Sequence, residues 1–317
     1  MASRKQQIKK ALDDPRGGLI EFIRQFSDDE TCRVYLEKKR WPNGPVCPRN
    51  GCKRDKPIYP MRSQKVRPGL YKCGACRRQF TVTIGTIFED SHVGLQKWFL
   101  VIYLMGASKK GMSAHQIYRS LDVTYETAWF MCHRVREAMR HRAFRNRLSG
   151  TVEADECYVG PRKPGKRGRG AAGKTIVFGM VERGGDVHAR AIPDVKKRTI
   201  QPLIRQTVQR GSRLMTDELL SYHGLGDAFQ HGMVDHSKEY VSGKDIHVNT
   251  QESFWALLKR GVTGTFHHIS KEKMDMYCGE FGFRFNTRHS SDMERFIDAV
   301  ANCDGRLRWN FRPEVRA

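Results

Sequence analysis

The sequence lacks any run of about 18 consecutive apolar residues, so it predicts no membrane-spanning helix. The opening stretch MASRKQQIKKALDD also lacks the apolar core of a secretory signal peptide. We therefore expect the protein to work in the cytoplasm, or at the nucleoid if its host is a bacterium, without a membrane partner. No internal repeat of fixed period is present either, which argues against a repeat architecture.

Acidic residues are in the minority. The 317 residues include 34 Asp and Glu against 57 Lys and Arg, which gives a net charge of +23. The basic residues recur along the whole chain, so a polyanionic partner is expected, and nucleic acid is the first candidate. A ribosome-associated or merely basic protein is the alternative, because charge alone names no reaction.

The first half of the chain alternates between helical and strand-like patterns. Residues 1–40 have a helical pattern, in which Ser27 and Glu30 are spaced as a capping box. Short strands and turns follow, and a second helical region begins near residue 91. There, Ser113 and Thr124 are expected N-caps of two short helices that resemble a helix-turn-helix.

The second half is rich in strand patterns. Three predicted strands lie in TVEADECYVG, KTIVFGMVER and DVHARAI, a helix begins at about Thr199, and a fourth strand lies in RLMTD. Three strands, a helix and a fourth strand are the order of elements in a ribonuclease H-like sheet. Between the first two strands, PRKPGKRGRGAAGK has the Gly and Lys/Arg content of a mobile loop.

Nine cysteines are present, but only four lie in close pairs. Cys47 and Cys52 in CPRNGC precede Cys73 and Cys76 in CGAC, inside the segment of short strands. Two turns that each supply two thiolates can form a tetrahedral zinc site without a large core. Disulfide pairing or chance spacing is the alternative, and the other five cysteines are expected to be buried thiols. Five basic residues could give the module a DNA-binding face: Arg62, Lys65, Arg67, Arg77 and Arg78.

Carboxylates occur where strands normally exclude them. Asp155 lies within the first predicted strand of the second half, and Asp217 lies at the end of the fourth. Acids at neighbouring strand ends can hold a divalent cation. A third candidate, Glu252, comes seven residues before Lys259, so both would lie on one face of a predicted helix. Each acid alone is more often a solvated charge or a helix cap.

Asp155, Asp217 and Glu252 with Lys259 resemble the DDE motif of the ribonuclease H-like transposases and integrases. Local strings, among them YKCGACRRQFTVTIGTIFEDS, EADECYVG and HVNTQESFWALLKRGVTGTFHHIS, resemble the insertion-sequence subfamily with an N-terminal zinc ribbon. The resemblance covers residues 27 to about 290. It implies that the three acids bind Mg²⁺ or Mn²⁺ for DNA cleavage and strand transfer, and that Lys259 neutralises phosphate. Asn249 or His247 could replace Glu252 as the third ligand, and Glu153 is a further competitor because it shares a strand face with Asp155.

The sequence therefore predicts an α/β protein with a ribonuclease H-like catalytic domain behind a zinc ribbon and a helix-turn-helix-like domain. We expect a DNA transposase that binds the terminal inverted repeats of an insertion sequence and acts as a homo-oligomer on DNA. A zinc-containing transcription regulator and a hydrolytic nuclease of the same fold are the alternatives. The predicted segments are an N-terminal helical segment (1–40), the zinc ribbon (41–90), the helix-turn-helix-like domain (91–148), the catalytic domain (149–300) and a C-terminal tail (301–317).

Overall fold

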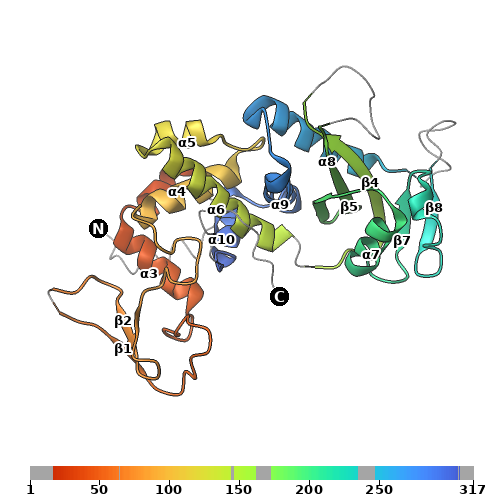
Figure 1. The fold of residues 1–317 in the computed structure, drawn as a ribbon. Coiled ribbons are helices and arrows are strands. Elements are labelled where there is room, and N and C mark those ends of the chain that lie inside the picture. The colour runs from red at the N-terminus through yellow and green to blue at the C-terminus, as the bar shows by residue number, and fades with distance from the viewer. Residues whose placement is uncertain are drawn as a thin grey trace. The chain divides into compact units, whose positions relative to one another are not determined.

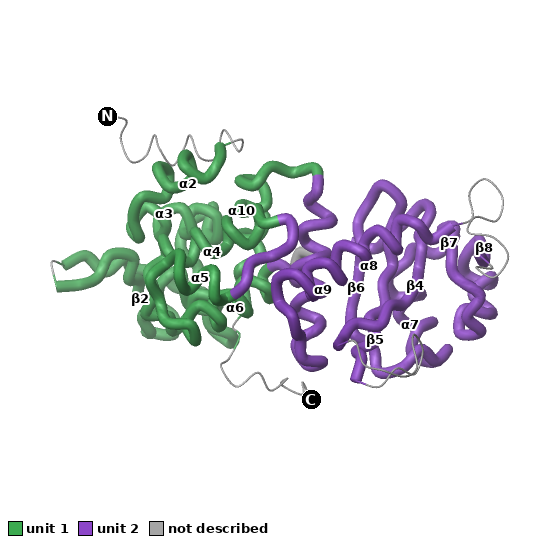
Figure 2. The backbone as a smooth tube through the Cα atoms, turned by 90° about the horizontal axis from the view of Figure 1, so that it is seen from above, with its two compact units in different colours: residues 1–108, 114–138, 289–317 green, residues 109–113, 139–288 purple. Residues whose placement is uncertain are grey.

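A computed structural model describes residues 17–63, 65–143, 146–161, 173–234, 247–305 and 307. The chain divides into two compact units, coloured separately in Figure 2. Unit 1 is formed by residues 1–108, 114–138 and 289–317, and unit 2 by residues 109–113 and 139–288. The predicted helix before residue 17 and most of the predicted loop at 161–174 lie outside the described residues. Among the described residues, no helix is both long and apolar enough to cross a membrane.

Unit 1 begins with two helices, α2 (Leu19–Gln25) and α3 (Asp29–Arg40), shown at the red end of the chain in Figure 1. The predicted capping box of Ser27 and Glu30 is wrong. Asp28 is the N-cap of α3, and its carboxylate accepts a hydrogen bond from the Thr31 N–H at 2.8 Å. The Asp28 carboxylate is one residue closer to the first turn than the Ser27 hydroxyl, while Glu30 pairs with Arg33.

A small antiparallel sheet follows. It consists of β1 (Ile58–Pro60), β2 (Tyr71–Cys73) and β3 (Gln79–Phe80), in that order. Ile58 is opposite Cys73, and Tyr71 is opposite Phe80. Trp41 packs edge-on against the rings of Tyr71 and Phe80, so aromatic side chains supply the core of a module with little regular structure.

The helical part of unit 1 contains α4 (Leu95–Ala107), α5 (Ala114–Leu121) and the larger part of α6 (Tyr125–Ala143), whose last residues belong to unit 2. The predicted cap at Thr124 is confirmed, because its hydroxyl accepts a hydrogen bond from the Thr127 N–H at 3.2 Å. Ile117 and Leu121 are buried on one face of α5. A turn of three residues therefore joins α5 to α6, with Asp122 in the left-handed conformation.

The last helix of the chain, α10 (Asp292–Ala301), also belongs to unit 1. Its Ser291 cap and Glu294 form a capping box. Phe296 is fully buried, and its ring centroid lies 4.9 Å from that of Phe22 and 5.2 Å from that of Phe99. The face of α10 that carries Phe296 therefore packs against helices from the first part of the chain. As a result, the predicted end of the catalytic domain at residue 300 does not coincide with the end of unit 2 at residue 288.

Unit 2 is built on a mixed five-stranded sheet with the order β6-β5-β4-β7-β8. Strand β4 is parallel to β7, and β7 is parallel to β8, whereas β5 is antiparallel to both β4 and β6. The predicted order of three strands, a helix and a fourth strand is confirmed. The strands are β4 (Thr151–Val159), β5 (Thr175–Glu182), β6 (Val187–Ile192), β7 (Arg213–Thr216) and β8 (Gln230–Met233).

Helices cover both faces of this sheet. On one face, α7 (Lys197–Thr207) packs Ile200 and Ile204 against Ala154 and Leu214. On the other, α8 (Asn249–Gly261) and α9 (Met274–Asn286) enclose a second core with Cys157 and Val181. Alternate residues of β4 thus point into two different cores. A turn of π-helix (Val262–Phe266) and two short 3-10 helices, Leu220–Tyr222 and Lys271–Lys273, complete the unit.

Candidate metal centres

The four paired cysteines converge at one point of unit 1. The Cys47 and Cys76 sulfurs are 3.8 Å apart, the Cys52 and Cys73 sulfurs are 3.7 Å apart, and all four sulfurs lie within 4.8 Å of one another. Four thiolates bound to one zinc ion at about 2.3 Å would be ~3.8 Å apart at tetrahedral angles. The donor type and the sulfur spacing therefore both fit zinc.

The peptide around the second knuckle favours thiolate formation. Backbone N–H groups of Cys76 and Ala75 lower the pKa of Cys73 to about 7, whereas burial raises the pKa of Cys47 to about 11. The five remaining cysteines are buried and form no disulfide, as expected: Cys32, Cys132, Cys157, Cys278 and Cys303. All five basic residues suggested for a DNA-binding face of this module are exposed: Arg62, Lys65, Arg67, Arg77 and Arg78.

A carboxylate cluster lies in unit 2, where β4 and β7 run side by side. Glu153 is opposite Met215, so two residues further along both strands Asp155 comes level with Asp217. Their carboxylates approach each other and that of Glu156, with one oxygen from each acid lying within 4.8 Å of the others. The sheet register brings together the two acids that were predicted from their strand positions, Asp155 within a strand and Asp217 at a strand end.

Each acid of this cluster is oriented by a neutral donor. The indole N–H of Trp255 donates to Asp155 Oδ2 at 2.9 Å, and the Tyr222 hydroxyl donates to Glu156 Oε2 at 3.2 Å. Asp217 Oδ1 accepts from the Leu219 N–H at 3.1 Å. Burial and the negative charges of Glu156 and Asp217 raise the pKa of Asp155 to about 7. Closely placed carboxylates of this kind suit a hard divalent cation, which would favour their ionised forms.

The third predicted acid, Glu252, is exposed on the first turn of α8, and its carboxylate is not part of this cluster. Asn249 is exposed on the same turn. Lys259, two helical turns further on, is also exposed. Lys259 comes four residues after Trp255, whose indole contacts Asp155, so the two residues share a face of α8.

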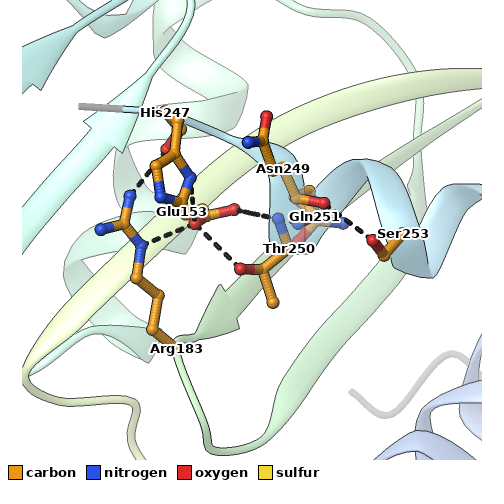
Figure 3. A network of polar contacts seen from close by, with 7 residues as sticks. All are labelled: Glu153, Arg183, His247, Asn249, Thr250, Gln251 and Ser253. Carbon is orange, nitrogen blue, oxygen red and sulfur yellow. Dashed lines mark hydrogen bonds and ion pairs between the residues drawn. The ribbon is translucent and has the colours of Figure 1, made fainter. Parts of the chain in front are cut away.

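Glu153 and His247 have a different environment. The Glu153 carboxylate is fully buried and contacts Arg183, His247 and the start of α8, as Figure 3 shows. Glu156, by contrast, was missed by sequence reasoning. Side chains alternate between the two faces of a strand, so Glu156 is expected to point away from the face of Asp155. The acid pair in ADEC was the available signal.

Comparison with known proteins finds transposase sequences similar to both parts of the chain. Residues 27–79 match the model of a transposase zinc-ribbon domain, and residues 147–286 match that of an ISXO2-like transposase domain. An uncharacterized protein in the transposable element ISH50 of Halobacterium salinarum is 32% identical over 281 residues, which cover 83% of this chain and 92% of the relative. An uncharacterized transposase-like protein of Haemophilus influenzae is 32% identical over 101 residues, covering 32% of this chain and 80% of that relative.

Proposed function

The chain belongs to the insertion-sequence transposases that combine a zinc-ribbon domain with an ISXO2-like transposase domain, and we propose that it cuts and joins DNA at the ends of its element. The observation that carries this proposal is the convergence of Asp155, in the middle of β4, with Asp217, directly after the neighbouring parallel strand β7. The proposed fold of unit 2 is ribonuclease H-like. Its support is the order of the elements and the single antiparallel strand β5 within the five-stranded sheet.

In this proposal, Asp155 and Asp217 hold Mg²⁺ or Mn²⁺, because hard carboxylate oxygens suit these ions. When bound, a pair of such ions activates the attacking oxygen and stabilises the leaving oxygen of an in-line displacement at phosphorus. Trp255 keeps the Asp155 carboxylate in place through its indole N–H. Lys259 would neutralise a phosphate near the scissile bond, since it lies one turn after Trp255 on the same face of α8.

Glu252 is the proposed third ligand and would come from α8. Its support is its place one turn before Trp255, the residue of α8 that contacts Asp155. Glu156 competes with it from within the carboxylate cluster, and Asn249 competes from the same turn of α8. His247 is a weaker competitor because its Nδ1 lies 3.2 Å from Glu153.

Recognition of the terminal inverted repeats is proposed for unit 1. The exposed basic residues of the zinc module and the α5–α6 pair, joined by a short turn, support this assignment. Zinc would be structural there, because four thiolates fill its coordination shell. We also propose that the protein acts as a homo-oligomer on DNA, in the cytoplasm or at the nucleoid of a bacterial host.

One assay separates this function from its alternatives. The full chain is incubated with Mg²⁺ and DNA carrying the ends of the element. A transcription regulator would bind only, a hydrolytic nuclease would cut only, and a transposase transfers the 3′ end to a second DNA. Binding without cleavage in either Mg²⁺ or Mn²⁺ would refute the proposed activity.

The same assay identifies the third ligand when pre-cut ends are used. We expect Glu252→Ala to abolish strand transfer while leaving end binding nearly unchanged, because removal of one ligand disables a metal centre as a unit. Glu156→Gln and Asn249→Ala are measured beside it, first with Mg²⁺ and then with Mn²⁺. Near-normal transfer by Glu252→Ala together with an inactive Asn249→Ala or Glu156→Gln would move the assignment to that residue.

A further inference from the structure

Glu153 stands two residues before Asp155 on the same face of β4, and its side chain has no exposed surface. Its Oε1 accepts hydrogen bonds from Arg183 Nε at 2.7 Å and from the Thr250 hydroxyl at 3.0 Å. Its Oε2 accepts from the backbone N–H groups of Thr250 at 2.8 Å and of Gln251 at 3.0 Å. Figure 3 shows these donors converging on one carboxylate from the strand side and from the start of α8.

The local sequence does not cap α8. Its N-cap is Val248, whose side chain has no hydrogen-bonding group, and no side-chain cap is present there. The first N–H groups of a helix otherwise need an acceptor, and a negative charge is favourable at this end of the helix dipole. The Glu153 carboxylate supplies the acceptor and the negative charge, although it lies 97 residues before Thr250 in the sequence. Strand β4 therefore caps the helix that carries Glu252 and Lys259.

Two hydrogen-bonded contacts fix α8 lengthwise along β4. Glu153 binds the Thr250 N–H, and Asp155 binds the indole N–H of Trp255. From Glu153 to Asp155 the strand advances by about 6.6 Å. From Thr250 to Trp255 the helix advances by about 7.5 Å. The spacings along strand and helix match, so α8 runs in the same direction as β4 and in step with it.

Close approach of the two elements depends on a glycine. Gly179 of β5 is opposite Asp155, and a Cβ atom at this position would lie 2.4 Å from Gln251 Nε2 and 2.6 Å from the ring of Trp255. The helix thus lies directly on the sheet, where a change at its cap would shift Trp255 relative to Asp155.

We propose that Glu153 is a positioning residue of the active site, which holds α8 in register with β4 so that groups on this helix reach the Asp155–Asp217 pair. This inference rests on the proposed function for its catalytic consequence, but its structural part does not. Glu153, a competitor for the position of third metal ligand in the sequence analysis, would thus act by holding α8 and not by binding the metal.

The test compares Glu153→Gln with the wild type and with Glu182→Gln as a matched control. The amide keeps the size of the side chain but turns an N–H group toward donors, so α8 or Arg183 loses an acceptor. Glu182 is a suitable control because its carboxylate also accepts a backbone N–H, but from Ser149, at 2.8 Å, and not from the first turn of α8. The readouts are hydrogen exchange of the Thr250 and Gln251 amides, the NMR signal of the Trp255 indole N–H, Mn²⁺ binding and strand transfer.

For Glu153→Gln we expect faster amide exchange, a shifted indole signal and strand transfer reduced by at least about 10-fold, with Mn²⁺ affinity changed by less than about 3-fold. Loss of Mn²⁺ binding would instead identify Glu153 as a ligand and overturn the proposal. Unchanged exchange and indole signals would also overturn it, even if the melting temperature fell.

Thr250→Val is the second variant, because it removes only the hydroxyl donor to Glu153 and decides the question if Glu153→Gln does not fold. We expect the same changes as for Glu153→Gln, but smaller. If Thr250→Val has the amide exchange, indole signal and strand transfer of the wild type, the proposal is refuted. If the wild type neither cuts nor joins DNA, the proposed function fails, while the amide and indole measurements still decide the positioning role.

Discussion

Asp155 occupies a place where the fold opposes ionisation. Burial and the charges of two nearby carboxylates, Glu156 and Asp217, raise its pKa from 3.8 to about 7. The unfolded chain ionises this group at lower pH than the folded chain does, so the folded state loses stability as pH rises from about 4 to 7. A bound divalent cation would reverse this loss. The stability cost is thus tied to the chemistry proposed for the site.

Asp155→Asn should therefore stabilise the protein when magnesium is absent. We expect its melting temperature to exceed that of the wild type by about 4 °C or more at pH 8, and the difference to shrink toward pH 4. Mg²⁺ should raise the melting temperature of the wild type only. Calorimetry in magnesium-free buffer without a strong chelator leaves zinc in place. A lower melting temperature for the variant at pH 8 would contradict the proposed charge repulsion.

At the residue scale, the sequence could predict the members of the site that follow from strand position. Asp155 and Asp217 were recognisable because acids are rare in strands, and the parallel register then brings them level. Glu156 was not, because the alternation of a strand assigns it to the other face, although its longer side chain reaches the same cluster. The place of Glu252 depends on how α8 lies on the sheet, which the local sequence does not specify.

At the scale of elements, helix caps show where local prediction holds and where it fails. Thr124 caps α6 from within its own segment and was predicted. The cap of α3 was displaced by one residue because Asp28 and Ser27 both offer suitable oxygens. The cap of α8 comes from Glu153 on a distant strand, and no pattern within residues 247–261 indicates it. Local sequence cannot indicate a cap such as that of α8, because the residue that accepts these hydrogen bonds lies outside the segment.

The zinc module gives a prediction at the same scale. Its three strands are short, and its core is small, so the metal should supply much of its stability. We expect about one equivalent of zinc in the purified protein and its loss in Cys73→Ser, with faster hydrogen exchange in residues 41–80. Cys303→Ala, which removes a buried single thiol, should retain the zinc. A folded wild-type protein without zinc would refute the assignment.

At the scale of the whole molecule, chain order and spatial order differ. The sequence analysis assigns residues 149–300 to the catalytic domain, whereas α10 (Asp292–Ala301) belongs to unit 1. The spacing of apolar residues in α10 predicts that one face of the helix is buried, but it does not indicate which elements cover that face. Phe296 contacts aromatic rings of α2, α3 and α4, so the proposed DNA-binding unit is completed by the far end of the chain. A fragment of residues 1–148 would leave these rings uncovered.

Phe296→Ala tests this closure. The substitution removes a fully buried ring from the cluster of Phe22, Phe26 and Phe99, which should cost unit 1 about 3–5 kcal/mol. Hydrogen–deuterium exchange should become faster in α3 and α4, while β4 and β5 keep their protection, because the sheet has its own cores. Phe281→Ala, which opens the core under α8 and α9, is the matched control and should deprotect the sheet first.

Binding to the element's ends should weaken in Phe296→Ala at temperatures where Mn²⁺ binding at the carboxylate cluster is unchanged. Equal deprotection of both units by each variant would show that they unfold together, and the assignment of α10 to unit 1 alone would then fail.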